Sequence, residues 1–401
     1  MGILQELNDK RVWLAYLARR GQSGYTGGEE LAELSAYIEG ERWRAVTEPL
    51  TRGEFVFSLP VKSMISKIDT DRKRILYRFP KDEAMVLKVM NFLMARYDGL
   101  FGESCYAFRT NRTVRDAVKG LAAMPELGHK YTVKVDIRNF FNSVPAPRMI
   151  EMLEKHITDD KPLVEFLAWL LSRNQAIWKD GVLEEPTGVL PGSAMAGFLA
   201  NLYLTDVDEF FTSRGIAYFR YSDDILLFVD SEEEQQRCLN LLSDLIREKG
   251  MSLNPEKCVL TAPGQRWEYL GFSYADGECD LAAITVTKAK QRIRRHARQL
   301  YRENRRRGAM GYEETVKLLL KYFNTRFFHD EVTGFSWCRW YFSVITTSKS
   351  LEQIDACMQQ YIRYLYSGRH YKGNYRITYE KIKEMGYRSL VHEYYRYLKN
   401  E

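Results

Sequence analysis

Residues 220–230, RYSDDILLFVD, place two adjacent carboxylates, Asp223 and Asp224, between apolar segments with the composition of β-strands. Two such segments around a short polar pair indicate two strands that meet at a tight turn. Upstream, residues 131–137 (YTVKVDI) are β-branched and alternate between apolar and polar side chains, which predicts a strand that carries Asp136 near its end. If these strands pair, the three acids gather at one edge of a sheet.

Clustered carboxylates in apolar sequence need a chemical reason, because burying or crowding them costs about several kcal/mol unless a cation compensates them. Oxygen ligands of this kind suit Mg2+, which keeps its other positions for water or substrate phosphates. Two such ions about 3.5–4 Å apart support in-line phosphoryl transfer. The structural alternative is that Asp223 and Asp224 form a polar turn and that Asp136 caps a helix.

The segments around these strands predict a mixed fold. Helical patterns occupy residues 162–172 and 194–211, between the two strand regions, and an amphipathic helix at 231–250 precedes the strand-like stretch 251–260. This order is typical of an α+β layer, an antiparallel sheet with helices packed on one face. Before it, we expect patchy helices and a short β-like stretch at residues 54–61. After residue 287 the chain is predicted to be wholly helical.

Composition limits the classes of protein that the chain resembles. Its 401 residues suggest two or three structural units, and its net charge of +6 permits a polyanionic partner without showing one. No apolar stretch approaches the roughly 20 residues of a membrane span, and the first residues do not predict a secretory signal. The six cysteines are scattered, which argues against a structural zinc site and favours a reducing cytoplasm. We therefore predict a cytoplasmic protein without a membrane segment.

Two motifs carry a resemblance to a known family. Residues 135–141 (VDIRNFF) and 221–224 (YSDD) resemble the catalytic motifs of reverse transcriptases. The resemblance implies that Asp136, Asp223 and Asp224 hold two Mg2+ ions, with Mn2+ as an alternative ion. It also implies that Phe141 packs under the sugar C2′ and favours dNTPs. A buried core aromatic is the alternative for Phe141.

The same resemblance implies the fold of a right-hand polymerase with fingers, palm and thumb. We expect N-terminal helices and fingers over residues 1–130, and a catalytic palm with inserted fingers helices over residues 131–285. A helical thumb with a C-terminal extension follows over residues 286–401. The boundary near residue 285 rests on the change to a wholly helical, basic sequence.

Two further segments resemble the fingers of bacterial enzymes of this family, including group II intron-like and retron-like ones. Residues 104–117 (SCYAFRTNRTVRDA) are similar to their Phe-Arg segment, which implies that Arg109 and Arg112 contact nucleic acid. Lys67 and Arg74 match the bases that hold the incoming triphosphate, a polyanion suited to an ammonium and a forked guanidinium. Lys62 and Arg72 are rivals for that role. A solvated basic loop is the alternative.

Residues 188–204 (GVLPGSAMAGFLANLYL) are similar to the motif that supports the template and the nascent base pair, with Gly192 allowing close backbone approach. This chain departs from the family pattern here. The usual Pro-Gln-Gly reads Leu190-Pro191-Gly192, and the usual Ser-Pro reads Ala196-Gly197. The base-pair contacts and the use of a template are therefore open.

The last two motifs of the palm follow in the family's order. Residues 254–260 (NPEKCVL) resemble the motif in which Lys257 neutralises or protonates the leaving pyrophosphate. Residues 267–272 (WEYLGF) resemble the hairpin that grips the primer end, which implies nucleic-acid contacts by Trp267 and Gly271. A packed β-turn with glycine at the bend is the alternative.

A basic helix is predicted after the palm. Helical spacing puts Lys288, Arg292, Arg295 and Arg302 on one face, and ten Lys and Arg residues lie between 288 and 307 with Glu303 as the single acid. Such a face tracks a phosphate backbone with strong salt dependence. A solvated charged face is the alternative. The aromatic and basic residues at 337–375 suit either base stacking or, as we favour, the packing of a helical bundle.

The resemblance implies an RNA-directed DNA polymerase that uses dNTPs, copies RNA and makes DNA. Similarity to bacterial stand-alone enzymes further implies a structured non-coding RNA as template and a role in antiphage defence. Two alternatives stand beside it. One is template-independent or protein-primed DNA synthesis, motivated by Leu190-Pro191-Gly192. The other is an inactive RNA-binding protein. The sequence predicts no particular oligomeric state.

Overall fold

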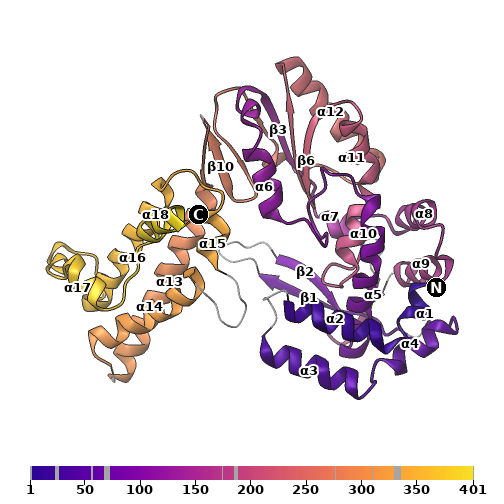
Figure 1. The fold of residues 1–401 in the computed structure, drawn as a ribbon, viewed down its shortest axis with the longest axis horizontal. Helices are drawn as coiled ribbons and strands as arrows, with labels where there is room; N and C mark the ends of the chain where they lie inside the picture. The colour runs from indigo at the N-terminus through magenta and orange to yellow at the C-terminus, as the bar shows by residue number, and fades with distance from the viewer. Residues whose placement is uncertain are drawn as a thin grey trace. The chain divides into compact units, whose positions relative to one another are not determined.

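The computed structural model describes residues 2–22, 27–55, 57–66, 73–173, 175–184, 188–275, 277–308, 310–328 and 336–400. The chain forms two compact units (Figure 1). The first unit comprises Met1–Ser23, Gly28–Ala117 and His129–Pro263, and the second comprises Gly24–Gly27, Val118–Gly128 and Gly264–Glu401.

The elements of the first unit follow the chain from its N-terminus. Its helices are α1 (Ile3–Glu6), α2 (Lys10–Gln22), α3 (Gly28–Glu39), α4 (Arg44–Thr51), α5 (Lys81–Leu93), η1 (Met94–Leu100), α7 (Phe140–Ser143), α8 (Ala146–His156), α9 (Lys161–Ser172), α10 (Ala196–Tyr203), α11 (Thr205–Thr212), α12 (Glu232–Glu248) and η3 (Pro255–Lys257). Its strands are β1 (Val61–Ser66), β2 (Lys73–Arg78), β3 (Tyr131–Asp136), β4 (Gln175–Trp178), β5 (Gly181–Glu184), β6 (Ala217–Tyr221), β7 (Asp224–Val229) and β8 (Val259–Thr261). Helix α6 (Val114–Ala122) joins the two units, and η2 (Pro125–His129) follows it.

The central sheet of the first unit has the strand order β6-β7-β3-β8 and is antiparallel throughout. Helix α12 packs on β3 and β7, and α11 packs on β6. Helix α12 begins where the Ser231 side chain accepts a hydrogen bond from the Glu234 amide. Its Gln235 side chain donates to the carbonyls of Thr132 in β3 and Thr261 in β8. The α+β class predicted from the order of strands and helices is confirmed.

A second sheet, with the order β2-β1-β4-β5, forms from the N-terminal third and a later hairpin. The predicted β-like stretch at residues 54–61 is wrong in position, since the strand begins at Val61. The reason is packing: the rings of Phe55 and Phe57 lie 5.6 and 5.2 Å from the ring of Phe166 in α9. This anchors the segment to a helix rather than to a neighbouring strand.

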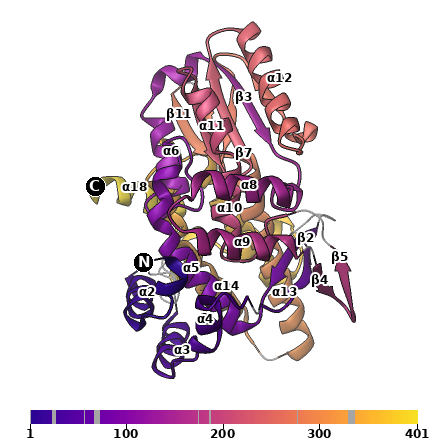
Figure 2. The same cartoon turned by 90° about the vertical axis from the view of Figure 1, so that its right-hand side faces the viewer.

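Three helices make the centre of the first unit. Figure 2 shows α8, α10 and α9 grouped beside the sheets, and α8 packs against both of the others. Every residue of α10 is buried except Gly197. Apart from Asn201 this helix is apolar on all sides, and such a helix is stable where protein encloses it. It holds the segment before the central hairpin in place.

The second unit is a three-stranded antiparallel sheet followed by helices. Its strands are β9 (Trp267–Tyr269), β10 (Phe272–Ala275) and β11 (Glu278–Leu281), in the order β11-β10-β9. Its helices are α13 (Ala283–Arg307), α14 (Tyr312–Phe328), α15 (Trp337–Phe342), α16 (Lys349–Ser367), η4 (Lys372–Arg376), α17 (Tyr379–Glu384) and α18 (Leu390–Asn400). Helix α16 packs against α13, α14 and α18 (Figure 1). Within the described ranges, no helix has both the length and the apolar character of a membrane span.

Candidate active site

The three acids of the predicted site lie at one end of the central sheet. Strands β6 and β7 are joined by a two-residue turn, since Tyr221 pairs with Asp224. Ser222 adopts a positive φ of 60° in this turn. Across the sheet, Asp136 of β3 is the register partner of Asp224, and the Ile137 amide donates to the Asp223 carbonyl at 3.2 Å. The backbone alone therefore brings the lone acid beside the acidic pair.

The first acid of the site, Asp136, is only 4% exposed. Its Oδ2 accepts from the ammonium of Lys257, and its Oδ1 accepts from Asn254 Nδ2 at 3.5 Å. The Asn254 amide also donates to the Asp136 carbonyl at 2.8 Å. The predicted pyrophosphate ligand, Lys257, is thus placed against a carboxylate that is a predicted metal ligand. Its side chain remains 46% exposed.

Asp223 and Asp224 lie in an environment that disfavours negative charge. Burial raises the pKa of Asp223, and the nearby charge of Asp136 raises it further. Burial also raises the pKa of Asp224 to about 6, and the charges of Asp223 and Asp136 add to the effect while Lys134 opposes it. Burial, together with the neighbouring carboxylates, therefore favours the neutral form of both groups.

The donor set suits a hard divalent cation, because carboxylate oxygens crowded enough to raise each other's pKa gain most from such an ion. Asp136, Asp223 and Asp224 are the residues that would hold it. Among the residues that the structure describes, however, no group of three or more His, Cys, Asp or Glu side chains lies in an arrangement ready to hold a metal ion. The Asp136 carboxylate is engaged by Lys257 and Asn254 instead.

A buried arginine supports the acidic turn, and the sequence analysis missed it. Arg220 is 0% exposed; its Nε and Nη2 donate to the Asp208 carboxylate at 2.6 and 2.5 Å. Its Nη1 donates to Asn201 Oδ1 at 3.1 Å and reaches the Ser222 carbonyl at 3.5 Å. The signal available in the sequence was an arginine inside an otherwise apolar strand.

An aromatic group stands beside the turn. Phe141, the predicted sugar-selecting residue, is partly exposed in α7. The ring of Phe108 contacts Phe141 edge-on at 5.8 Å and lies 6.4 Å from the Tyr221 ring. Phe108 is 53% exposed and has a φ of 55°. An added Cβ at Gly197 would come within 2.6 Å of this ring, so glycine, where the family has proline, makes room for Phe108.

The loop that carries Gly192 is held against strand β2. The Tyr77 amide of β2 donates to the Pro191 carbonyl at 2.8 Å. Gly192 has a φ of 100°, and an added Cβ would meet the Tyr77 carbonyl at 3.0 Å. The close backbone approach predicted for Gly192 is therefore made to strand β2 of the protein itself.

The two predicted triphosphate ligands fall at the limit of the described chain. Lys67 and its rival Arg72 lie outside the described residues. Arg74 lies in β2, where its Cα is the register partner of Ile65. Lys62 in β1 is half-buried, with its ammonium 6.0 Å from the centre of the Trp178 ring.

Arg109, predicted to contact nucleic acid, makes its bonds within the protein. The Arg109 side chain is 8% exposed, and its guanidinium binds both carboxylate oxygens of Asp98. It also donates to the carbonyls of Gly102 and Cys105. The guanidinium of Arg109 thus donates its hydrogen bonds to groups of the protein and stabilises the loop that carries it. Arg112 is more accessible and lies 5.3 Å from the centre of the Tyr106 ring.

The remaining predicted residues belong to the second unit. Trp267 is 8% exposed and stacks on Tyr274 at 4.1 Å, while Gly271 has a φ of 89° and lies against Thr285. Both residues belong to a hairpin with a packed β-turn and glycine at its bend, the alternative given for this motif in the sequence. The predicted basic face of α13 is present and exposed, with the buried residues Ile293 and Ala297 on another side of the helix. That face comprises Lys288, Arg292, Arg295 and Arg302.

Known proteins similar to this chain indicate its family. Residues 73–274, just over half of the chain, match the family model described as reverse transcriptase (RNA-dependent DNA polymerase). This range contains the three acids and Lys257. An uncharacterized 91 kDa protein in the cob intron of Schizosaccharomyces pombe is 24% identical over 165 residues, which are 41% of this chain and 20% of that protein.

A bacterial relative and a solved structure are also similar. The retron Ec86 reverse transcriptase of Escherichia coli is 22% identical over 153 residues, 37% of this chain and 44% of that protein. The chain thus spans less than half the length of both curated relatives. The structure of telomerase from Candida albicans, with a fragment of telomeric RNA, aligns with a TM-score of 0.44 and 10% identity over 86% of this chain and 68% of that one.

Proposed function

Since the chain belongs to the reverse transcriptase family, we propose that it is an RNA-directed DNA polymerase with the fingers, palm and thumb of a right-hand polymerase. The observation that carries the proposal is the register of β3 with β7, in which Asp136 lies opposite Asp224 beside the Tyr221–Asp224 turn. A nucleotidyltransferase of this class needs carboxylates from two separated stretches of chain at one point. This sheet supplies them.

In this proposal Asp136, Asp223 and Asp224 hold two Mg2+ ions, with Mn2+ as a substitute. When bound, the ions activate the primer hydroxyl and stabilise charge on the leaving pyrophosphate. The raised pKa values of Asp223 and Asp224 support the assignment, because the crowded carboxylates gain most from a cation. Lys257, already beside Asp136, supplies an ammonium for the pyrophosphate.

The substrate contacts follow from the surrounding elements. Phe141 selects the deoxyribose, and the triphosphate is held by Arg74 of β2 and by Lys67, which lies outside the described residues. Gly192 lets its own loop pack against β2, and this packing supports the part of the site that binds the dNTP. Arg112 and the basic face of α13 bind the phosphate backbone of template and product, while Trp267 and Gly271 shape the turn near the primer.

We assign the biological setting by analogy. The similarity to a retron enzyme of a bacterium supports a structured non-coding RNA as template, in the cytoplasm and in antiphage defence. The second candidate is template-independent or protein-primed DNA synthesis on the same fold. It is favoured by one observation: Phe108 packs on Gly197, where the family has proline, so the template side of the site is altered.

The test is primer extension on an RNA template with Mg2+. Asp223→Asn combined with Asp224→Asn is expected to lower dNTP incorporation by about 10³-fold or more, because the ion-binding charge is lost. Asp230→Asn is the matched control, since that acid is 77% exposed at the far end of β7. Undiminished incorporation by the double variant would refute the proposal. Homopolymer made from one dNTP without template would favour the second candidate.

A further inference from the structure

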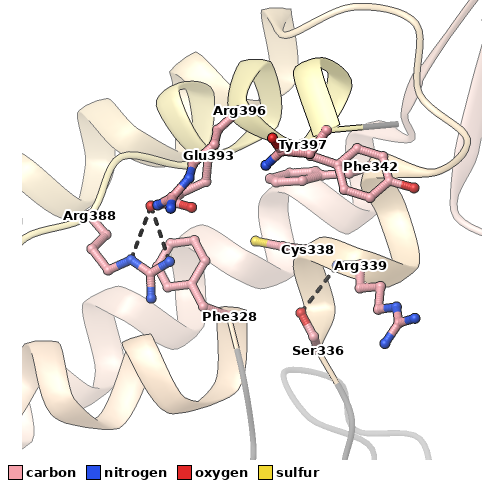
Figure 3. Close-up of a pocket in the computed structure, with 10 residues that line it drawn as sticks. Phe328, Ser336, Cys338, Arg339, Phe342, Arg388, Glu393, Arg396 and Tyr397 are labelled. Atoms are coloured by element: carbon pink, nitrogen blue, oxygen red, sulfur yellow. Dashed lines mark hydrogen bonds and ion pairs between the residues drawn. The ribbon is translucent and has the colours of Figure 1, made fainter.

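A cavity of about 560 Å³ lies within the second unit, away from the residues of the proposed active site in the sequence. Its walls come from the end of α14, from α15 and from α18 (Figure 3). This volume lies within the range of sites that enclose a small molecule or a nucleotide. No part of the proposed polymerase chemistry uses it.

Aromatic side chains form the walls of this cavity. Tyr397 of α18 is half-buried, and its ring centre lies 6.0 Å from that of Phe342 of α15, which is 3% exposed and supports it from behind. Phe328, at the end of α14, presents its ring to the guanidinium of Arg388 at 3.9 Å (Figure 3). Flat apolar faces at the edge of a cavity suit a planar ring, and nucleobases stack on such faces with little dependence on sequence.

The charges that the described residues bring to the cavity are mainly positive. Among those residues, three arginines and one carboxylate line it, and Arg388 is bonded to that carboxylate, Glu393, at 3.1 Å. Arg339 and Arg396 are exposed, and within the described part of the chain neither guanidinium has a hydrogen bond or ion pair. A nucleotide could stack its base on the aromatic side chains and accept hydrogen bonds from these two guanidiniums through its phosphates.

The chemistry of the cavity indicates binding rather than reaction. Cys338 is its one nucleophile of note, and burial raises the pKa of its thiol well above the usual range. A neutral thiol is a poor nucleophile at neutral pH. A duplex cannot present a base face to the walls, because its bases are already stacked on each other, so the ligand has to be unpaired.

We propose that this cavity binds one unpaired nucleotide of a single-stranded nucleic acid, with its base against Tyr397 and with the phosphates on its two sides at Arg339 and Arg396. The inference rests on the proposed function only in taking nucleic acid as the ligand. It gives the C-terminal helices a second role, the anchoring of a single strand outside the duplex held during synthesis.

The test uses the full chain and a fluorescent oligo(U) RNA, with binding followed by anisotropy. Tyr397→Leu keeps apolar contact but removes the ring and is expected to weaken binding about fivefold or more. Tyr397→Phe keeps the ring and is expected to bind as the parent does. Arg339→Gln with Arg396→Gln is expected to weaken binding and to flatten its salt dependence by about 0.7 per lost phosphate contact.

Three controls make the outcomes distinct. Arg237→Gln removes an exposed charge from α12 in the first unit and is expected to leave binding unchanged. Duplex RNA, oligo(dT) and free UTP replace oligo(U) in parallel, which separates single-stranded RNA from DNA and from a mononucleotide. Equal binding by Tyr397→Leu, Tyr397→Phe and the parent chain would overturn the inference, as would an equal loss for duplex RNA.

Primer extension at saturating template separates this inference from the polymerase assignment. The cavity variants are expected to incorporate dNTPs as the parent does once template is in excess. If the parent protein fails to extend primers while Tyr397→Leu still loses single-strand binding, the polymerase proposal fails and the cavity site stands. Equal thermal unfolding midpoints for the two Tyr397 variants would exclude misfolding as the cause.

Discussion

The guanidinium of Arg220 and the carboxylate of Asp208 form a bidentate pair at 2.6 and 2.5 Å, with both side chains almost completely removed from water. Asp208 lies in α11 and Arg220 lies in β6, one residue before the Tyr221–Asp224 hairpin turn. The pair therefore fixes the strand that leads into the acidic turn. Nη1 of the same arginine reaches the Ser222 carbonyl within the turn.

Removing one member of this pair is expected to destabilise the first unit. Arg220→Met leaves the Asp208 charge buried without a partner, which costs about 3–5 kcal/mol in the free energy of unfolding. Adding Asp208→Leu removes that charge and is expected to recover most of the loss. Urea unfolding measures both changes. Primer extension by the double variant is expected to stay low, because the turn still lacks the arginine; full activity would show that Arg220 serves stability alone.

Stability is expected to depend on pH through Asp224. Its pKa is raised to about 6, mainly by burial, so the folded protein binds a proton more tightly than the unfolded chain does. The resulting contribution to stability is complete below about pH 4, the ordinary aspartate value, and is lost as pH rises through about 6. At pH 8, Asp224→Asn is therefore expected to have a free energy of unfolding about 1–3 kcal/mol higher than that of the parent protein.

Thermal unfolding at several pH values measures this difference. The gain for Asp224→Asn is expected to shrink as the pH is lowered toward 4, where the parent carboxyl is protonated. Asp230→Asn, at an exposed position of the same hairpin, controls for the loss of any one acid. A gain that is constant with pH would contradict the electrostatic explanation.

Divalent ions are expected to stabilise the parent protein in the absence of substrate. Ions bound by the crowded carboxylates raise the free energy of unfolding by about 2.7 kcal/mol at one hundred times the dissociation constant. Adding MgCl2 or MnCl2 is expected to raise the unfolding midpoint, and EDTA to reverse the change. The variant with both Asp223→Asn and Asp224→Asn is expected to show no such rise; an equal rise there would place the ions elsewhere.

The packing of the Gly192 loop against β2 is expected to be disrupted by a single added methyl group. Gly192→Ala adds a Cβ at 3.0 Å from the Tyr77 carbonyl at a φ of 100°, which an L side chain rarely adopts. We expect a loss of about 1–3 kcal/mol and a raised KM for dNTP. Gly99→Ala is the matched control, because nothing lies within 4 Å of its added Cβ and its φ is ordinary. Equal melting of the two variants would contradict the constraint.

Local sequence patterns were enough to predict the central hairpin, β3 and helix α12, which ends at Glu248, two residues before the predicted stop at Gly250. Their apolar periodicity and turn residues act within a few positions of chain. The misplaced strand at residues 54–61 shows the limit, since Phe55 and Phe57 pack on a helix more than 100 residues later. The β4–β5 hairpin was missed because its strands are short and largely exposed.

The site was predicted less completely than the fold. Three acids were predicted by motif, yet the side chains that bind Arg220, from Asp208 to Cys105, lie 12 to 115 residues away in the chain, and no local pattern indicates them. Arg109 was assigned to nucleic acid from charge and motif alone. Its burial on Asp98 depends on a fold that charge does not reveal. The predictions for Phe141, Lys67 and Arg74 remain predictions.

The ion pair between Lys257 and Asp136 means that the resting protein carries its own counter-ion. In the proposed mechanism, an incoming magnesium ion competes with the Lys257 ammonium for the same carboxylate. The affinity for the metal ion then depends on how much more strongly Asp136 attracts the ion than it attracts the Lys257 ammonium. In the proposed polymerase, the most buried of the three site acids is thus neutralised between rounds of synthesis.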